Sequence, residues 1–293
     1  MSHRARAIPE AAVRRSRRRR GGLLGVAPWV YVAVAAIIVL PPVAWTVSTS
    51  LKLEADTIKF PPDWIPTPPS LGGYAELLNS TNIQFFVNSL LYAAGCILLS
   101  LAICLPAAYV ATRHRSRGMG ILMDGILVLS MVPAIVVFVA LYSMSAKIGL
   151  INSYPLLILV YTAIISGQVI LFLRNFIENV PVEIEEAAAI DGCSRLQILR
   201  WVVVPLILPG IAAISIFIFV FVWNDYLVGT VLATTDNMKT MQNGIVRYLQ
   251  TGFGVIWAAF CAFVVVAFAP VLGLFSAFQR WFIAGMTSGG VKG

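Results

Sequence analysis

The sequence predicts an all-α integral membrane protein with six transmembrane helices and both termini in the cytoplasm. Of its 293 residues, 59% are hydrophobic and only 12% are charged, and the mean hydropathy is +0.87. Soluble domains are about half apolar and a quarter charged, so this composition indicates a protein that crosses the bilayer several times. Six apolar windows are long enough for a hydrocarbon core about 30 Å thick, and a helix satisfies its own backbone hydrogen bonds in lipid.

The six windows are separated by polar turns and loops. In chain order they are Leu23–Val47, Phe85–Val110, Ile121–Ser145, Leu156–Leu173, Ile207–Val228 and Val255–Phe278. We therefore expect a basic N-terminal tail over residues 1–22 and a transmembrane permease-like domain over residues 23–279 that contains a cytoplasmic loop at 175–205. A cytoplasmic C-terminal tail is expected over residues 280–293.

The distribution of positive charge orients these helices. If both termini lie on one side, sixteen of the 21 Lys and Arg residues lie with them and five lie on the other side. An excess of Lys and Arg marks the cytoplasmic face. The cluster Arg14–Arg20 would also suit nucleic acid, but an apolar run follows it directly. We therefore interpret the cluster as an anchor for the first helix and expect no nucleic-acid partner.

Residues for catalysis or metal binding are not grouped in this sequence. The four cysteines and two histidines lack metal-ligand or redox spacing, so we expect no metal site and no disulfide. The chain has no Gly-Lys dipeptide and therefore no phosphate-binding loop of the form G-x-x-x-x-G-K-[ST]. No nucleophile–base pair suggests hydrolysis. The sequence thus predicts neither an enzyme nor a cofactor site in this chain.

The loop between the fourth and fifth windows is the most distinctive segment. Residues 174–204 are charged and predict two short helices. Pro181 suits a first helical position, and the acidic residues after it complement the helix dipole. Gly192 suits a left-handed stop, and Ser194 with Gln197 forms a capping-box pattern that restarts a helix. One interpretation is an amphipathic helix at the membrane surface; the other is a docking surface for a second protein.

Several motifs of the chain together resemble a known family. Glu186-Ala187-Ala188, Gly192, Val202, Val204 and Pro205 are similar to the EAA loop of binding-protein-dependent ABC importer permeases, which prefer Ile or Leu at the two valine positions. Motifs similar to the carbohydrate branch are Glu185, Ile190-Asp191, Asn88-Ser89, Trp223-Asn224-Asp225-Tyr226 and Gln279-Arg280-Trp281-Phe282, with a MalG-like ending at Gly285-Met286-Thr287 and Gly290-Val291-Lys292-Gly293. The likeness covers residues 23 to 293. Gly167-Gln168 stands where many relatives have Pro-Phe, so the fourth helix would lack that proline kink.

The resemblance implies the ABC type I importer permease fold and a bacterial plasma (inner) membrane location. It also implies a second permease subunit, two ATP-binding subunits and an extracytoplasmic solute-binding protein as partners, with ATP and Mg²⁺ bound by the ATPase. The residues expected to couple to that ATPase are Glu183, Glu185, Glu186, Ala187, Ala188, Ile190, Asp191, Gly192 and Arg195. Closure of the ATPases would push this helix and switch the spans from inward-facing to outward-facing.

Polar residues in two windows are candidates for the substrate path: Asn88, Ser89, Trp223, Asn224, Asp225 and Tyr226. A charge is costly in lipid, which singles out Asp225 and Asp124. We interpret Asp124 as an interfacial residue near Arg117 or another cytoplasmic cation, whereas the amide and aromatic groups beside Asp225 suit sugar hydroxyls and ring faces. Helix capping and helix–helix hydrogen bonding are the alternatives. The polar loop Gly229–Gly254 would either meet a solute-binding protein or form a solvated connection.

We therefore predict a permease subunit of an ATP-driven sugar importer. A permease for a polyol or glycerol phosphate is an alternative, although no window centre carries the Arg or Lys that a phosphate would favour. An ion-coupled secondary carrier is less favoured because midplane carboxylates and an internal repeat are missing. A membrane scaffold or receptor would have the spans but no reason to carry the glutamate–alanine–glycine loop.

Overall fold

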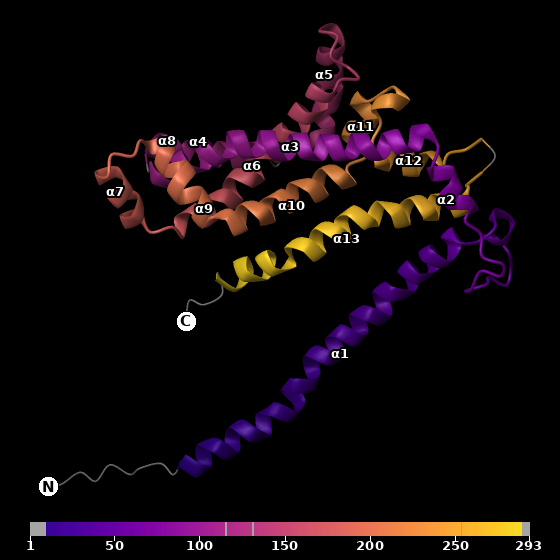
Figure 1. The fold of residues 1–293 in the computed structure, drawn as a ribbon, viewed down its shortest axis with the longest axis horizontal. Coiled ribbons are helices and arrows are strands. Elements are labelled where there is room, and N and C mark those ends of the chain that lie inside the picture. Colours follow the sequence, from indigo (N-terminus) through magenta and orange to yellow (C-terminus); the bar gives the residue numbers. More distant parts are fainter. Residues whose placement is uncertain (1–9, 115, 131, 253, 289–293) are drawn as a thin grey trace.

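All regular elements are helices in the part of the chain that this computed structural model describes, residues 10–114, 116–130, 132–252 and 254–288. Four long helices form an elongated bundle (Figure 1): α3 (Ser80–Arg113), α6 (Tyr154–Glu178), α10 (Leu208–Asn224) and α13 (Trp257–Ser288). Helix α3 packs along α6 and α10, and α10 packs along α13. These four helices hold most of the buried core.

The first helix lies largely outside this bundle. Helix α1 (Glu10–Ser50) contacts α13 and diverges from the bundle toward its own N-terminal end (Figure 1). Residues 10–22, expected as a tail, are helical, and so are residues 280–288 of the expected C-terminal tail. Residues 1–9 and 289–293 lie outside the described residues. The start of α1 and the end of α13 both point toward the end of the molecule that carries α7 (Figure 1).

The described residues do not confirm the predicted count of six spans. Four single helices are long and apolar enough to cross a membrane: Trp29–Ser50, Ser80–Arg113, Tyr154–Glu178 and Trp257–Ala277. A fifth span is reached if Arg195–Leu206 and Leu208–Asn224, which are bent by 81° relative to each other, are counted as one. Helix α6 is longer than the fourth predicted window, because it begins at Tyr154 and continues to Glu178.

The third predicted window is divided into two shorter helices. Helix α4 covers Arg117–Ser130 and helix α5 covers Ala134–Lys147, and α5 projects away from the bundle (Figure 1). Pro133 precedes α5 with φ −59° and ψ 119°. Proline has no N–H to donate, and it disfavours helical backbone in the residue before it, Val132. Pro133 therefore indicates this break in the sequence, although the apolar composition on both sides suggests one continuous helix.

The two ends of the bundle carry different short elements. One end, here named the α7 end, carries α7 (Val182–Ile190), α8 (Arg195–Ile198), a π-helical turn (Leu199–Val203) and α9 (Val204–Leu206). The opposite end, here named the α12 end, carries α2 (Gly72–Leu77), α11 (Leu227–Leu232), the 3₁₀ turn η3 (Asp236–Met238) and α12 (Met241–Arg247). The candidate sites lie at these two ends.

Small residues and aromatic rings let the helices of the bundle approach closely. Gly210 of α10 lies against the ring of Phe176 of α6, and a Cβ atom on this glycine would come within 2.4 Å of the ring. Trp223 stacks on Phe219 with ring centroids 5.3 Å apart and donates its indole N–H to the carbonyl of Ala267 at 3.0 Å. Lipid gives little hydrophobic drive for helix association, so close packing and interhelical hydrogen bonds hold such a bundle together.

A carboxylate ties the segment after α1 to the start of α13. Glu54, in the 3₁₀ turn η1 (Glu54–Asp56), accepts the backbone N–H groups of Trp257 at 2.7 Å and Ala258 at 2.9 Å. The first N–H groups of a helix have no partner inside the helix, and the helix dipole favours negative charge there. Glu54 thus caps a helix that begins about 200 residues further along the chain.

Candidate functional site

Helix α7 and the turn after it form the segment predicted to dock on another protein. The helix starts after Pro181, which lies just outside it, and Glu183 and Glu185 occupy its first turn. Gly192 has a φ of +88°, the left-handed conformation that glycine adopts most easily. Ser194 and Gln197 form the reciprocal capping box that starts α8. The predicted helix stop and restart are therefore confirmed.

The glutamates of α7 differ in their surroundings. Glu183 and Glu186 are exposed, whereas only 3% of Glu185 is exposed. One Glu185 carboxylate oxygen accepts the hydroxyl of Tyr109 at 2.8 Å. The other accepts Nε and Nη2 of Arg113 at 2.9 and 2.6 Å. Within this chain, Glu185 thus binds the end of α3, and Glu183 and Glu186 remain available to a partner.

The outward surface of α7 and α8 combines apolar and charged side chains. Ile190 is 87% exposed and Leu196 is 71% exposed. The other exposed residues of this surface are Val182, Glu183, Ile184, Glu186, Ala187, Asp191, Gly192 and Arg195. Ala188, which also belongs to it, is half-buried. Contiguous exposed apolar side chains that are rimmed by charges are typical of a surface covered by another protein. We name this set the α7 surface.

At the α12 end, Asn88 of α3 is fully buried and makes four hydrogen bonds. Its amide donates to the carbonyls of Asn237 and Lys239, both at 2.9 Å. Its oxygen accepts the Tyr154 hydroxyl at 2.6 Å and the Gln84 amide at 2.9 Å. Asn88, a candidate for the substrate path or for helix–helix hydrogen bonding, therefore joins α3, α6 and the loop around η3.

Two further side chains of α3 hold the same loop. The Ser89 hydroxyl accepts the backbone N–H of Met241, the first residue of α12, at 2.8 Å. The buried hydroxyl of Tyr92, which the sequence did not single out, donates to the carbonyl of Met238 at 2.8 Å. We name residues 236–247, which α3 holds in this way, the outer cap.

The other candidate path residues lie where α10 ends. The helix stops at Asn224, so the predicted window to Val228 was too long and Asp225 and Tyr226 follow the helix. Asp225 accepts the Tyr161 hydroxyl at 3.1 Å and the N–H of Val228 at 2.9 Å. Trp223 is buried, Tyr226 is partly exposed and Asn224 is exposed. The motif Trp223–Tyr226 therefore combines a buried indole, which supports the region, with polar groups that are accessible.

The predicted polar loop after α10 is ordered into α11, η3 and α12. Thr240 and Asn243 form a capping box that starts α12. Lys239 donates to the carboxylate of Asp236 at 2.7 Å, and this contact holds the pKa of that carboxyl below its usual range. Arg247 lies 3.5 Å from the same carboxylate. The exposed side of the outer cap thus carries both charges and amides.

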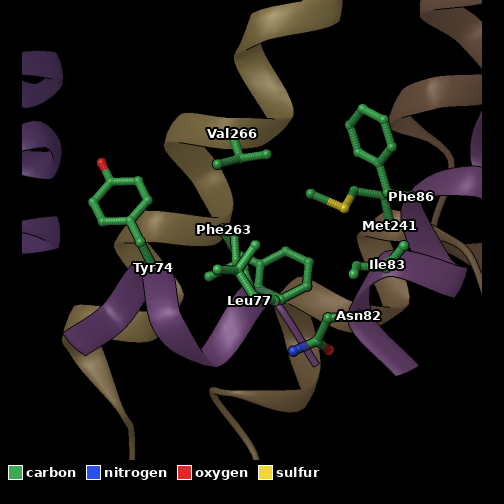
Figure 2. Close-up of a pocket in the computed structure, with 9 residues that line it drawn as sticks. Tyr74, Leu77, Asn82, Ile83, Phe86, Met241, Phe263 and Val266 are labelled. Carbon is green, nitrogen blue, oxygen red and sulfur yellow. The ribbon is translucent and has the colours of Figure 1, made fainter. Parts of the chain in front are cut away.

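A hollow of about 290 Å³ lies beside the outer cap (Figure 2). Its lining comes from α2, α3, α12 and α13, and its members are Tyr74, Leu77, Leu78, Asn82, Ile83, Phe86, Met241, Phe263 and Val266. The Asn82 amide donates to the carbonyl of Glu76 at 2.7 Å and to the Tyr248 hydroxyl at 2.8 Å. This mostly hydrocarbon lining suits apolar chains better than sugar hydroxyls.

The described residues contain no group of three or more His, Cys, Asp or Glu side chains that could hold a metal ion. The four cysteines are not joined in disulfides, and Cys193 of the loop after α7 is the one that is partly exposed. The chemistry at both ends of the bundle is that of hydrogen bonding and ion pairing.

Comparison with known proteins shows the family of this chain. The sequence pattern described as "binding-protein-dependent transport system inner membrane component" matches residues 103–288, from the last third of α3 to the end of α13. The chain belongs to this family. Its members are permease subunits of ABC importers, so the chain is a membrane permease.

Two similar permeases have names that state a solute. The sulfoquinovosyl glycerol transport system permease protein SmoH of Agrobacterium fabrum is 33% identical over 269 residues, which cover 91% of this chain and 94% of that protein. The diacetylchitobiose uptake system permease protein DasC of Streptomyces coelicolor is 32% identical over 267 residues, which cover 91% of this chain and 96% of that protein.

A solved structure shows the same fold. The crystal structure of a bacterial ABC transporter involved in the import of the acidic polysaccharide alginate aligns with a TM-score of 0.77 and 21% identity. The alignment covers 90% of this chain and 98% of that chain. The permease therefore has the ABC type I importer fold that the resemblance implied.

Proposed function

We propose that this permease forms half of the translocation path of an ATP-driven sugar importer and is moved by a separate ATPase through α7. The α7 surface carries the proposal, because an exposed Ile190 beside exposed carboxylates on a short polar helix suits a protein partner. The names of the relatives support a sugar as the solute. The full assembly would contain a second permease, two ATPases that bind ATP and Mg²⁺, and a solute-binding protein.

The proposed topology keeps six spans, with α4 and α5 together forming the third. In this topology the α7 end and both termini lie in the cytoplasm of a bacterial inner membrane, which the excess of Lys and Arg supports. The start of α1 and the end of α13 point toward that end, which supports this orientation (Figure 1). The outer cap would then face the solute-binding protein.

In this assembly the coupling residues take three roles. The exposed Glu183, Glu186 and Ile190, with Ala187, Asp191 and Arg195, would contact the ATPase. Ala188 would allow close packing, and Gly192 would set the angle of α8. Closure of the two ATPases would push α7 and switch the permease by a rigid-body movement between its inward-facing and outward-facing arrangements.

The accessible part of the α10 motif is the proposed sugar contact in this chain. Asn224 and Tyr226 offer an amide and a phenol, and Asp225 offers the carboxylate oxygen that does not bond to Tyr161. Asn88, Ser89 and Trp223 would support this region from the buried side, since their side-chain polar groups bond within the chain.

The proposal is tested by uptake into proteoliposomes that contain the permease with its co-expressed partners. We expect import of a sugar that the binding protein recognises to require ATP inside the vesicles and to proceed without an ion gradient. Uptake driven by a proton or sodium gradient without ATP would instead establish an ion-coupled carrier. A complex made with an ATPase variant that cannot hydrolyse ATP is the control and should import nothing.

A further inference from the structure

The side chain of Arg113 joins three segments of the chain at the α7 end. Arg113 is the last residue of α3. Its Nη2 donates to the carbonyls of Ile177 at 3.0 Å and Val180 at 2.9 Å, which lie where α6 ends. Nη2 and Nε also donate to one carboxylate oxygen of Glu185 on α7, and Tyr109 donates to the other. We name Arg113, Glu185 and Tyr109 the α3–α7 clasp.

The clasp is more buried than the other ion pairs in the described part of the chain. The side chains of Glu185 and Arg113 are 3% and 17% exposed, whereas Arg174 and Glu178, at the same end, are 30% and 42% exposed. Hydrogen bonds between charged groups are shorter and stronger than neutral ones, and water screens a buried pair less than an exposed pair. The clasp is therefore a stronger link than the more exposed pairs.

Packing alone does not make this link. The elements packed closest to α7 are α8 and the π-helical turn. Between α3 and α8 lies a hollow of about 400 Å³, whose lining includes Tyr109, Arg113, Arg195, Leu196 and Leu199. The chain itself runs from α7 to α10 through the left-handed turn at Gly192 and the 81° bend. The clasp connects α7 laterally to α3 through direct side-chain hydrogen bonds.

The other end of α3 is also fixed. Asn88, Ser89 and Tyr92 hold the outer cap through bonds to its backbone. Helix α3 is one continuous helix of 34 residues, although Pro106 lies inside it and donates no backbone hydrogen bond. At 1.5 Å per residue it is about 50 Å long. One helix therefore connects the α7 surface to the outer cap, with polar contacts at each end.

We propose that Arg113 is a positioning residue that fixes α7 to α3 through Glu185, so that movement of α7 is transmitted along α3 to the outer cap. This inference rests on the proposed function, because it assigns the route by which the push of the ATPase reaches the face of the solute-binding protein. Arg113 would contact neither the sugar nor the ATPase. It acts by keeping α7 and α3 together as one body.

The test measures the amount of sugar imported per ATP hydrolysed in proteoliposomes that contain the full complex. Arg113→Ala removes the clasp, Glu185→Gln keeps its shape but removes the carboxylate charge, and Arg113→Lys keeps the cation but loses the guanidinium fork. We expect the ratio to fall roughly tenfold in Arg113→Ala and less in the other two, in the range typical of coupling between sites. Arg174→Ala, which breaks the exposed pair with Glu178, should keep the wild-type ratio.

This ratio separates positioning from a purely structural role. A residue needed only for folding would reduce the amount of assembled complex and leave the sugar imported per ATP unchanged. The inference is overturned if the variants that assemble import wild-type amounts per ATP. It is overturned as well if none of the three assembles, because the clasp would then be a folding requirement. A wild-type complex that imports without ATP would refute the proposed function itself, whatever the variants do.

Discussion

Replacing Gly192 with proline is expected to abolish ATP-driven uptake while the permease still inserts into the membrane. Gly192 has a φ of +88°, and the proline ring fixes φ near −65°. The turn would therefore change direction, and α8 would leave its position relative to α7. Membrane insertion depends on the apolar spans, which this change does not touch. Uptake and membrane-fraction immunoblots of the same cells provide the measurement.

Gly192→Ala is the matched control for the turn. A Cβ atom at this position would meet nothing within 4 Å, so only the left-handed backbone is disfavoured, by roughly 1–2 kcal/mol. We expect partial uptake in this variant. Wild-type uptake in Gly192→Pro would show that the angle between α7 and α8 does not matter for transport.

Truncation of Asn88 should lower the stability of the permease much more than truncation of Asp225. Asn88→Ala removes four hydrogen bonds in a fully buried site and leaves the carbonyls of Asn237 and Lys239 without this partner. We expect a loss of about 2–4 kcal/mol in the free energy of unfolding.

Asp225→Ala removes two hydrogen bonds in a partly exposed site and should instead weaken sugar binding roughly tenfold, equivalent to about 1.4 kcal/mol.

Thermal unfolding in detergent and sugar titration of the complex separate these effects. Tyr161→Phe is the control for Asp225, because it removes the hydroxyl bonded to the carboxylate and keeps the carboxylate itself. Unchanged sugar affinity in Asp225→Ala would return Asp225 to a capping role only. Wild-type stability with altered sugar selectivity in Asn88→Ala would place Asn88 in the path instead.

The sequence predicted best the features that depend on neighbouring residues. The stop at Gly192 and the capping box of Ser194 and Gln197 are set by residues within a few positions, and both are present in the structure. The break before α5 also had a local signal, Pro133, but the apolar composition on both sides suggested one continuous span. Composition alone does not distinguish a single span from two short helices.

Features that depend on distant residues were not predictable. Glu185 and Glu186 are adjacent and chemically identical, yet one is buried and the other exposed. Arg113, which donates hydrogen bonds to the buried Glu185 carboxylate, lies 72 residues before Glu185 in the chain. The partners of Asn88 are backbone carbonyls 149 and 151 residues away, and a carbonyl leaves no mark in the sequence. Tertiary contacts thus decided which members of each motif face outward.

The claim that α7 docks on the ATPase is tested by site-specific cross-linking of α7 to the ATPase in the assembled complex. Ile190→Cys is introduced into a Cys193→Ser background, since Cys193 is the partly exposed native cysteine of this region, and Gln250→Cys at the α12 end is the control. With a reagent that joins cysteine to lysine, we predict an adduct between this permease and the ATPase from Ile190→Cys alone, and its formation should stop ATP-driven uptake. The claim is contradicted if Ile190→Cys gives no adduct and its thiol reacts with a maleimide as fast in the complex as in the isolated permease.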